Sequence, residues 1–222
     1  MGKLMVLDGL DGCGKSTQLA LLDDSLRQDG IHYRQISFPD YEQPSSALVR
    51  MYLSGELGGT PEAVNAYAAS SFYAVDRYAS YRCFWEKDYA AGVPVVAARY
   101  TTSNAIHQMT KLPPSEWDSF LGWLWDYEYT KLELPRPDRV VFLDMPPEVS
   151  QKLLSCRYDG DESKKDIHER NRAYLLHCRQ AALYAAAACG WMVIDCAREG
   201  APRDREEIHR EIRAIFDGMQ SS

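Results

Sequence analysis

Short apolar runs alternate along the chain with longer stretches whose apolar residues recur every three or four positions. Runs of about four to eight apolar residues that end at Gly, Pro or Asp are typical of buried strands, and the wider spacing is typical of helices. The pattern predicts strands over 3–8, 32–38, 93–98, 139–144 and 191–195. It predicts helices over 18–26, 45–53, 61–91, 103–109, 114–132 and 146–155, one ending near 189, and one at the C-terminus.

Strands that alternate with helices favour an α/β fold, in which a five-stranded parallel sheet is covered by helices on both faces. Ligands of such sheets gather beyond the carboxyl ends of the strands. Polar residues follow several of the predicted strands, namely a glycine-rich loop after residue 8, residues 38–40, Arg99 and Asp144. No repeat, linker or low-complexity segment interrupts the pattern, so we expect a single domain over residues 1–222.

The loop after the first strand has the spacing G-x-x-x-x-G-K-S, and a helix-forming stretch follows it directly. Its glycines allow successive backbone N–H groups to point at phosphate oxygens, and the helix N-terminus adds partial positive charge. Lys15 would reach the β- and γ-phosphates of a nucleoside triphosphate, and the Ser16 hydroxyl would ligate Mg²⁺. The strand, loop and helix therefore predict a P-loop that binds ATP. The residues expected to hold ATP are Gly9, Gly12, Cys13, Gly14, Lys15, Ser16 and Thr17.

Composition and net charge limit the kinds of molecule that the chain is expected to bind. The 222 residues carry a net charge of -7, which disfavours a nucleic acid polymer and favours a small phosphorylated substrate held by a few basic residues. No run of about 18 apolar residues predicts a membrane span, and the first strand begins too early to leave room for a signal peptide. We therefore expect a cytoplasmic enzyme. The six cysteines contain no C-x-x-C pair, which favours buried or incidental thiols over a zinc site or a disulfide framework.

Several segments besides the P-loop carry a resemblance to a known family. They are Phe38-Pro39-Asp40, Tyr73 to Arg77, Arg99 to Asn104, and Asp166 to Glu169. In this order and spacing they resemble the thymidylate kinases, which phosphorylate dTMP to dTDP with ATP. The resemblance covers nearly the whole chain, and it implies a P-loop NTPase fold with a mobile lid, a homodimer, and a role in nucleotide and dTTP biosynthesis.

The resemblance assigns roles around the nucleoside of the acceptor. Asp11 matches an aspartate that contacts the sugar 3′-hydroxyl, a role that suits a carboxylate as acceptor. Tyr73 matches the aromatic residue that stacks on thymine, with its neighbour Phe72 as the alternative. Asn104 matches an asparagine that hydrogen-bonds the pyrimidine, and Ser103 lies beside it. Phe38 would line the nucleoside pocket, although a core position is equally credible.

Two arginines and a lid are assigned to the phosphates. Arg77 resembles an arginine that reads the base or touches the monophosphate. Arg99 follows a buried strand, where its planar donors would suit the acceptor phosphate. The loop has no arginine of its own, so a lid over about 156–170 must supply a cation to the transferred group. Arg157 is the first candidate there, and the others are Lys164, Lys165 and Arg170. The predicted catalytic residues are thus Lys15, Arg99 and Arg157.

One position departs from the family pattern. Thymidylate kinases carry aspartate before the arginine that corresponds to Arg99, whereas this chain carries Ala98. The missing carboxylate predicts weakened chemistry with nucleotide binding largely intact, and Asp8 is a candidate to supply a carboxylate to magnesium instead. Two alternatives therefore stay open: a kinase for dUMP or a deoxynucleoside, and a nucleotide-binding protein without catalysis.

Overall fold

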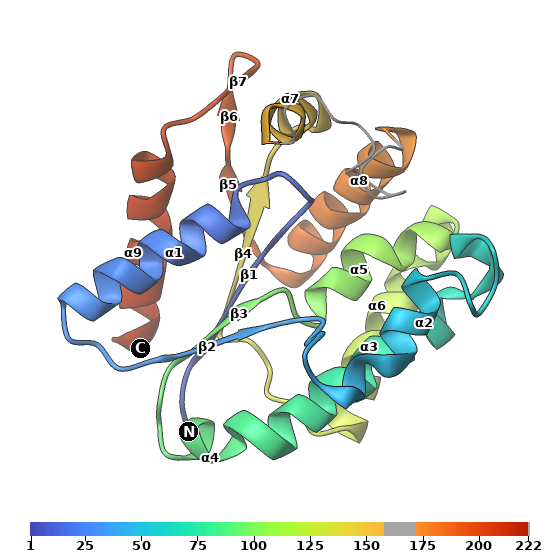
Figure 1. Cartoon of the computed structure of the whole chain (residues 1–222), viewed down its shortest axis with the longest axis horizontal. Coiled ribbons are helices and arrows are strands. Elements are labelled where there is room, and N and C mark those ends of the chain that lie inside the picture. The colour runs from blue at the N-terminus through green and yellow to red at the C-terminus, as the bar shows by residue number, and fades with distance from the viewer. Residues whose placement is uncertain (158–171, 222) are drawn as a thin grey trace. The chain divides into compact units, whose positions relative to one another are not determined.

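Five parallel strands form the sheet of this protein, in the order β2-β3-β1-β4-β5. The computed structural model describes residues 1–157 and 172–221 (Figure 1). The strands are β1 (Leu4–Gly9), β2 (Arg34–Ser37), β3 (Val95–Ala98), β4 (Arg139–Asp144) and β5 (Met192–Asp195). Every residue of β1 and β3 is buried, as expected for strands with helices on both faces. The predicted α/β fold is confirmed.

Helices follow the strands. They are α1 (Lys15–Gln28), α2 (Ala47–Leu53), α3 (Ala66–Ser80), α4 (Glu86–Ala90), α5 (Thr102–His107), α6 (Trp117–Trp125), α7 (Pro147–Arg157), α8 (Arg172–Cys189) and α9 (Arg205–Gln220). Two π-helical turns, Tyr81–Trp85 and Asp126–Lys131, follow α3 and α6. Within the described ranges, no helix is long and apolar enough to cross a membrane.

The described chain divides into two compact units. Unit 1 comprises Met1–Val6 and Tyr33–Asp138, and unit 2 comprises Leu7–His32 and Arg139–Ser222. The P-loop therefore belongs to unit 2, whereas most of the predicted acceptor residues belong to unit 1.

Unit 1 carries β2, β3 and the helices from α2 to α6. The paired strands end at Ser37 and Ala98, which lie opposite each other in the ladder. The segments that follow this last pair contain Phe38 and Arg99, as the sequence predicts for the carboxyl ends of parallel strands.

The start of α3 differs from its prediction. A single 3₁₀ turn occupies Pro61–Ala63, and Val64 is extended, so the helix does not begin at residue 61. It begins after Asn65, whose side chain accepts a hydrogen bond of 2.8 Å from the backbone N–H of Ala68. The proline suggested a helix start, but the N-cap asparagine sets it.

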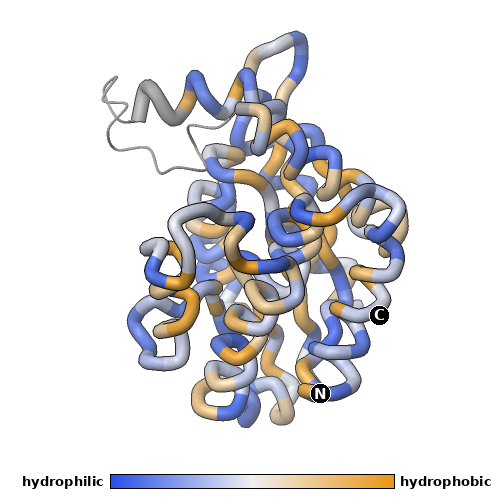
Figure 2. Tube along the Cα trace, turned by 90° about the vertical axis from the view of Figure 1, so that its right-hand side faces the viewer, coloured by the Kyte–Doolittle hydropathy of each residue, from blue (hydrophilic) through white to orange (hydrophobic). Residues whose placement is uncertain are grey.

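Unit 2 packs α1 beside α9, where Gln18 Nε2 donates to the carbonyl of Arg205 at 2.9 Å. Figure 1 shows these two helices on one side of β4 and β5, with α8 on the other. The buried positions of α9 form one stripe at helical spacing. They are Ile208, Ile212, Phe216 and Met219. Figure 2 colours the chain by hydropathy, and hydrophobic and hydrophilic residues alternate along the tube that ends at C.

A short hairpin after β5 is absent from the predicted elements. Its strands are β6 (Ala197–Arg198) and β7 (Ala201–Pro202), joined by Glu199 and Gly200. Both turn residues have positive φ, 52° and 76°, which is the conformation of a two-residue type I′ turn. Strands of two residues are too short to show alternation in the sequence.

Candidate active site

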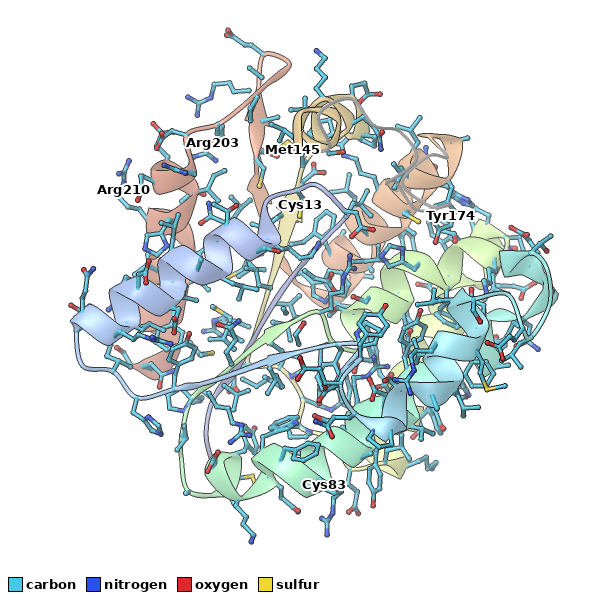
Figure 3. All side chains as sticks on the ribbon, in the orientation of Figure 1. Cys13, Cys83, Met145, Tyr174, Arg203 and Arg210 are labelled. Carbon is cyan, nitrogen blue, oxygen red and sulfur yellow. The ribbon has the colours of Figure 1, made fainter. Side chains whose placement is uncertain are left out.

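The glycine loop of unit 2 lies between β1 and α1. Gly9 has φ 156°, and a Cβ at this position would lie 2.6 Å from Cys13 Sγ and 2.8 Å from the carbonyl oxygen of Leu143. Only glycine fits this gap, because both contacts are shorter than real side chains make. Cys13, labelled in Figure 3, is buried and fills space inside the loop. The cysteines at positions 13, 83, 178, 189 and 196 form no disulfide among the residues that the structure describes.

The loop ends at the N-terminus of α1. Gly14 precedes the helix with φ 93°, and a Cβ built on it would meet no atom within 4 Å. No side chain within the described ranges caps α1, so its first-turn N–H groups keep their capacity to bind an anion. Ser16 and Thr17 are exposed in this turn. The open space and the helix end make a cradle of the kind that binds phosphate.

Backbone carbonyl groups of the glycine loop hold the side chain of Lys15 in place. Its Nζ donates to the carbonyl oxygens of Gly9 at 2.6 Å and Leu10 at 2.9 Å, and lies 3.6 Å from Cys13 Sγ. Neutral carbonyls satisfy the ammonium group without cancelling its charge. A phosphate that arrives at the cradle therefore meets a cation that is already in place.

The two predicted magnesium ligands also belong to unit 2. Asp8 is fully buried, and its Oδ1 accepts a hydrogen bond of 2.8 Å from the backbone N–H of Gly9. Among residues 1–157 and 172–221, no three His, Cys, Asp or Glu side chains gather as a metal site. One hydroxyl and one carboxylate fit Mg²⁺, which usually keeps several waters and takes its other ligands from phosphates. Asp11, between them in the chain, is half-buried.

In unit 1, Arg99 has an unusual backbone. Its φ is 61°, in the left-handed region that non-glycine residues seldom adopt. Its Nη1 lies 3.2 Å from His107 Nε2 on α5. Strained residues cluster at functional sites, so this conformation supports a special role for the Arg99 side chain. Before it, Ala98 closes β3, and its carbonyl accepts a hydrogen bond from the N–H of Phe38 at 3.0 Å.

Tyr73 lies on α3 among other aromatic residues. Its ring meets the ring of Tyr52 edge to face, with centroids 6.5 Å apart. Burial raises the pKa of the Tyr73 phenol, and the phenols of Tyr52 and Tyr41 act in the same direction, whereas the charges of Arg99 and Arg77 oppose them. The structure thus brings together the predicted stacking residue and both predicted arginines. Phe38 is buried with its ring 5.9 Å from that of Tyr100, and this contact favours a core role for it.

Arg77 is buried, with 1% of its surface exposed, and it pairs with a residue that the sequence analysis did not select. Its Nε donates to Glu128 Oε2 at 2.6 Å, and its Nη2 donates to Glu128 Oε1. Burial alone would lower the pKa of Arg77, but the charge and hydrogen bonds of Glu128 outweigh burial and raise it. The guanidinium is therefore charged, and the carboxylate neutralises it.

The side chain of Asn104 donates a hydrogen bond to the same carboxylate, that of Glu128. Its Nδ2 lies 3.3 Å from Glu128 Oε1 and 3.3 Å from the carbonyl oxygen of Ser70 on α3. Ser103 precedes it in α5 and is half-buried. The predicted base-reading asparagine is therefore fixed between α3 and the π-helical turn that carries Glu128.

Lys111 is a second residue that no sequence motif marks. Its Nζ donates to the Tyr52 hydroxyl at 2.9 Å and to the Val64 carbonyl at 2.8 Å. Burial lowers its pKa from 10.5 to about 8, and the charge of Glu62 opposes the shift. Lys111 ends the 3₁₀ turn Met109–Lys111 after α5, and Glu128 lies in the π-helical turn after α6, and no motif marks either residue in the sequence.

The predicted lid cations are not placed by the structure. Arg157 is the last residue of α7, and its side chain lies outside the described part of the chain. Lys164, Lys165 and Arg170, with Asp166 and Glu169, lie outside the described residues. Asp144, at the end of β4, accepts hydrogen bonds of 2.6 and 2.7 Å from Arg179 on α8, which supports a structural role for it.

Comparisons with known proteins agree with these features. The family model for thymidylate kinase matches residues 7–212. A thymidylate kinase from Mycobacterium tuberculosis (strain ATCC 25618 / H37Rv) is 30% identical over 192 residues, covering 85% of this chain and 87% of that protein. One from Danio rerio is 25% identical, covering 99% and 92%. The solved structure of thymidylate kinase from Candida albicans shares the fold, with a TM-score of 0.68 at 18% identity, covering 99% and 92%. This chain therefore belongs to the thymidylate kinase family.

Proposed function

We propose that this protein transfers the terminal phosphoryl group of ATP to the 5′-phosphate of dTMP, which yields dTDP and ADP. One observation carries the proposal: in a chain of this family, the glycine loop holds the Lys15 ammonium at a helix N-terminus that is open to an anion. The acceptor phosphate oxygen attacks the γ-phosphorus, a new P–O bond forms, and the bond to the bridging oxygen of ADP breaks.

The donor side consists of unit 2 residues. The backbone N–H groups of the loop and of Ser16 and Thr17 bind the ATP phosphates. Lys15 exchanges the carbonyls of Gly9 and Leu10 for phosphate oxygens, and so brings positive charge to the leaving group. Mg²⁺ would be held by the Ser16 hydroxyl, with the Asp8 carboxylate nearby in the chain, and would neutralise phosphate charge. In our proposal, Arg157 supplies the further cation.

On the acceptor side, the two arginines have different tasks. Because Glu128 neutralises Arg77, this residue suits a neutral base better than a dianionic monophosphate. Arg99, with its left-handed backbone after β3 and its side chain beside the imidazole of His107, would bind the acceptor phosphate. Tyr73 stacks on the base, Asn104 and Ser103 bind its edge, and Asp11 accepts from the sugar 3′-hydroxyl. Phe38 supports this pocket from the core.

The remaining proposals concern the whole protein. We propose that residues 1–222 act as one kinase domain in the cytoplasm, where the product feeds dTTP synthesis, and that the protein is a homodimer without nucleic acid or membrane partners. A homodimer is supported by exposed apolar side chains on the helical segment from α3 to α4. They are Val75, Tyr78 and Phe84, with 45%, 41% and 44% of their surfaces exposed.

An ADP-release assay across acceptors tests this function. We expect turnover with dTMP above that with dUMP, dCMP and thymidine; thymidine lacks the phosphate that Arg99 would bind. Lys15→Ala should lower the rate by about 100-fold or more, since electrostatic stabilisation of the transferred group supplies most of the catalysis. Lys87→Ala, on the exposed surface of α4, is the matched control and should leave the rate unchanged. ATP binding without turnover of any acceptor would favour the non-catalytic alternative, and a preference for thymidine would favour a deoxynucleoside kinase.

A further inference from the structure

The carboxylate of Glu128 is a hub inside unit 1. Glu128 lies in the π-helical turn Asp126–Lys131 and is fully buried. Arg77 donates two hydrogen bonds to it, Thr101 Oγ1 donates one to Oε2 at 2.8 Å, and Asn104 Nδ2 donates one to Oε1 at 3.3 Å. These donors come from α3, from the turn after β3 and from α5. A carboxylate has about four accepting positions, so this hub is fully occupied.

The hub fixes which way the Asn104 amide points. Both neighbours of Nδ2, Glu128 Oε1 and the carbonyl oxygen of Ser70, can only accept hydrogen bonds. A flipped amide would place Oδ1 against two acceptors, which the hydrogen-bond network forbids. In the part of the chain that the structure describes, both hydrogen bonds of the Asn104 side chain use Nδ2, so Oδ1 keeps its capacity to accept.

Ser70 connects this amide to the stacking residue. It lies one helical turn before Tyr73 on α3, so the two positions share a face of the helix. Asn104 is thus held beside the segment that we propose to stack on the base, and it presents an oxygen there. Where that oxygen faces N3 of a pyrimidine, the base can satisfy it only if N3 carries a hydrogen.

We propose that Glu128 is a positioning residue for base selection: by holding Nδ2 of Asn104, it makes the pocket an acceptor that favours pyrimidines with an N3–H group and rejects cytosine. This inference rests on the proposed function. Thymine and uracil carry a hydrogen at N3, whereas N3 of cytosine has a lone pair that would face the lone pairs of Oδ1. Sites that are built around one hydrogen-bond polarity reject the opposite polarity strongly, because the mismatched groups stay buried and unpaired.

Glu128→Gln tests this role with little change of volume. Glutamine brings an NH₂ group to the hub, so the Asn104 amide can turn and point its own NH₂ toward the base. We expect the ratio of kcat/KM for dTMP to that for dCMP to fall about tenfold or more, mainly through a higher KM for dTMP. Glu116→Gln, on an exposed 3₁₀ turn of the same unit, is the matched control and should keep the ratio. Glu128→Asp keeps the charge, and it should lower the ratio of kcat/KM values less than Glu128→Gln does.

The outcomes separate this proposal from the proposed function. No phosphorylation of dTMP by the unaltered protein contradicts the function itself. Phosphorylation of dTMP with an unchanged ratio in folded Glu128→Gln overturns the role of Glu128 alone. If Glu128→Gln does not fold, because Arg77 loses its counter-charge, the ratio is measured in Glu128→Asp, whose shorter side chain keeps the charge but reaches Asn104 less well, and an unchanged ratio there overturns the role of Glu128.

A measurement on the unaltered protein tests the inference even if neither variant folds. The side-chain NH₂ protons of Asn104, followed by ¹⁵N NMR without nucleotide, should exchange slowly with solvent because Glu128 and Ser70 hold them. Fast exchange, or equal kcat/KM for dTMP and dCMP, would overturn the inference.

Discussion

Arg77 and Arg99 differ in what surrounds them, and we propose different tasks for them on that ground. Arg77 is enclosed and neutralised by Glu128, so it offers hydrogen-bond donors without net charge. Arg99 has a left-handed backbone, and its Nη1 lies 3.2 Å from the imidazole of His107; we propose that it binds the acceptor phosphate. Both arginines can be selected from sequence motifs, but those motifs do not identify the side chains that contact them. Glu128 lies 51 positions after Arg77, and no local pattern connects them.

Ala98 is the residue where activity is expected to be below that of the family. Its methyl group gives Arg99 no acceptor and gives magnesium no charge. Ala98→Asp should raise kcat for dTMP about tenfold, because a charged hydrogen bond would then orient the phosphate-binding arginine. Ala98→Asn matches the size without the charge and should give a smaller gain. An unchanged rate in a folded Ala98→Asp protein, measured by ADP release, would remove Ala98 from the account.

Lys111 makes stability depend on pH in a predictable direction. Its pKa is about 8 in the folded protein and near 10.5 when unfolded. Between these values the unfolded chain binds more protons, so the contribution of Lys111 to the free energy of unfolding rises with pH. The free energy of unfolding is measured by urea unfolding from pH 7 to pH 10 for the unaltered protein and for Lys111→Met. Above about pH 8, the value for the unaltered protein should rise relative to that for the variant. A difference that is flat or falls would contradict the burial of this ammonium group.

At the scale of elements, the start of α3 depends on one side chain. Asn65→Ala should lower the free energy of unfolding by about 1 kcal/mol, because it removes the N-cap hydrogen bond to Ala68. Asn65→Asp keeps an acceptor and should cost little. Equal loss in both variants, measured by urea unfolding, would mean that the cap does not set the helix start.

Strands and helices were predictable to the extent that their apolar spacing was regular. The residues of β4 match their prediction, and β5 differs by one residue, because both are apolar runs with clear ends. The predicted helix over 114–132 instead becomes α6 followed by the π-helical turn Asp126–Lys131. A π-turn adds a residue to the helical turn and changes which side chains face inward. Glu128 nevertheless continues the buried stripe of α6, because it lies seven and four residues after the buried Leu121 and Leu124. Apolar spacing therefore allows its burial, and what the sequence does not show is the distant partner, Arg77, that neutralises its charge.

At the scale of the whole molecule, the family motifs predicted the fold and the donor loop, since both depend on local sequence. The chemistry of the acceptor side depends on contacts between distant segments, and the structure was needed to find them. The two compact units divide the predicted residues accordingly, with the donor loop in unit 2 and the base-reading residues in unit 1.

The exposed apolar residues of α3 suggest a surface for self-association. If Val75 and Tyr78 lie in a dimer interface, Val75→Glu with Tyr78→Glu should yield monomers in sedimentation velocity, because buried unpaired charges disfavour association. Leu176→Glu on α8, where the leucine is also exposed, should leave the mass unchanged. A monomeric unaltered protein would contradict the proposed homodimer.

The most direct test of the central claim follows the phosphate itself. The unaltered protein is incubated with Mg²⁺, dTMP and ATP that carries a labelled γ-phosphate, and the nucleotides are separated. We expect the label to appear in dTDP in a one-to-one ratio with ADP, and Lys15→Ala to lower the formation of both by about 100-fold or more. Label that appears only as inorganic phosphate, or that stays in ATP while ATP is bound, would contradict it.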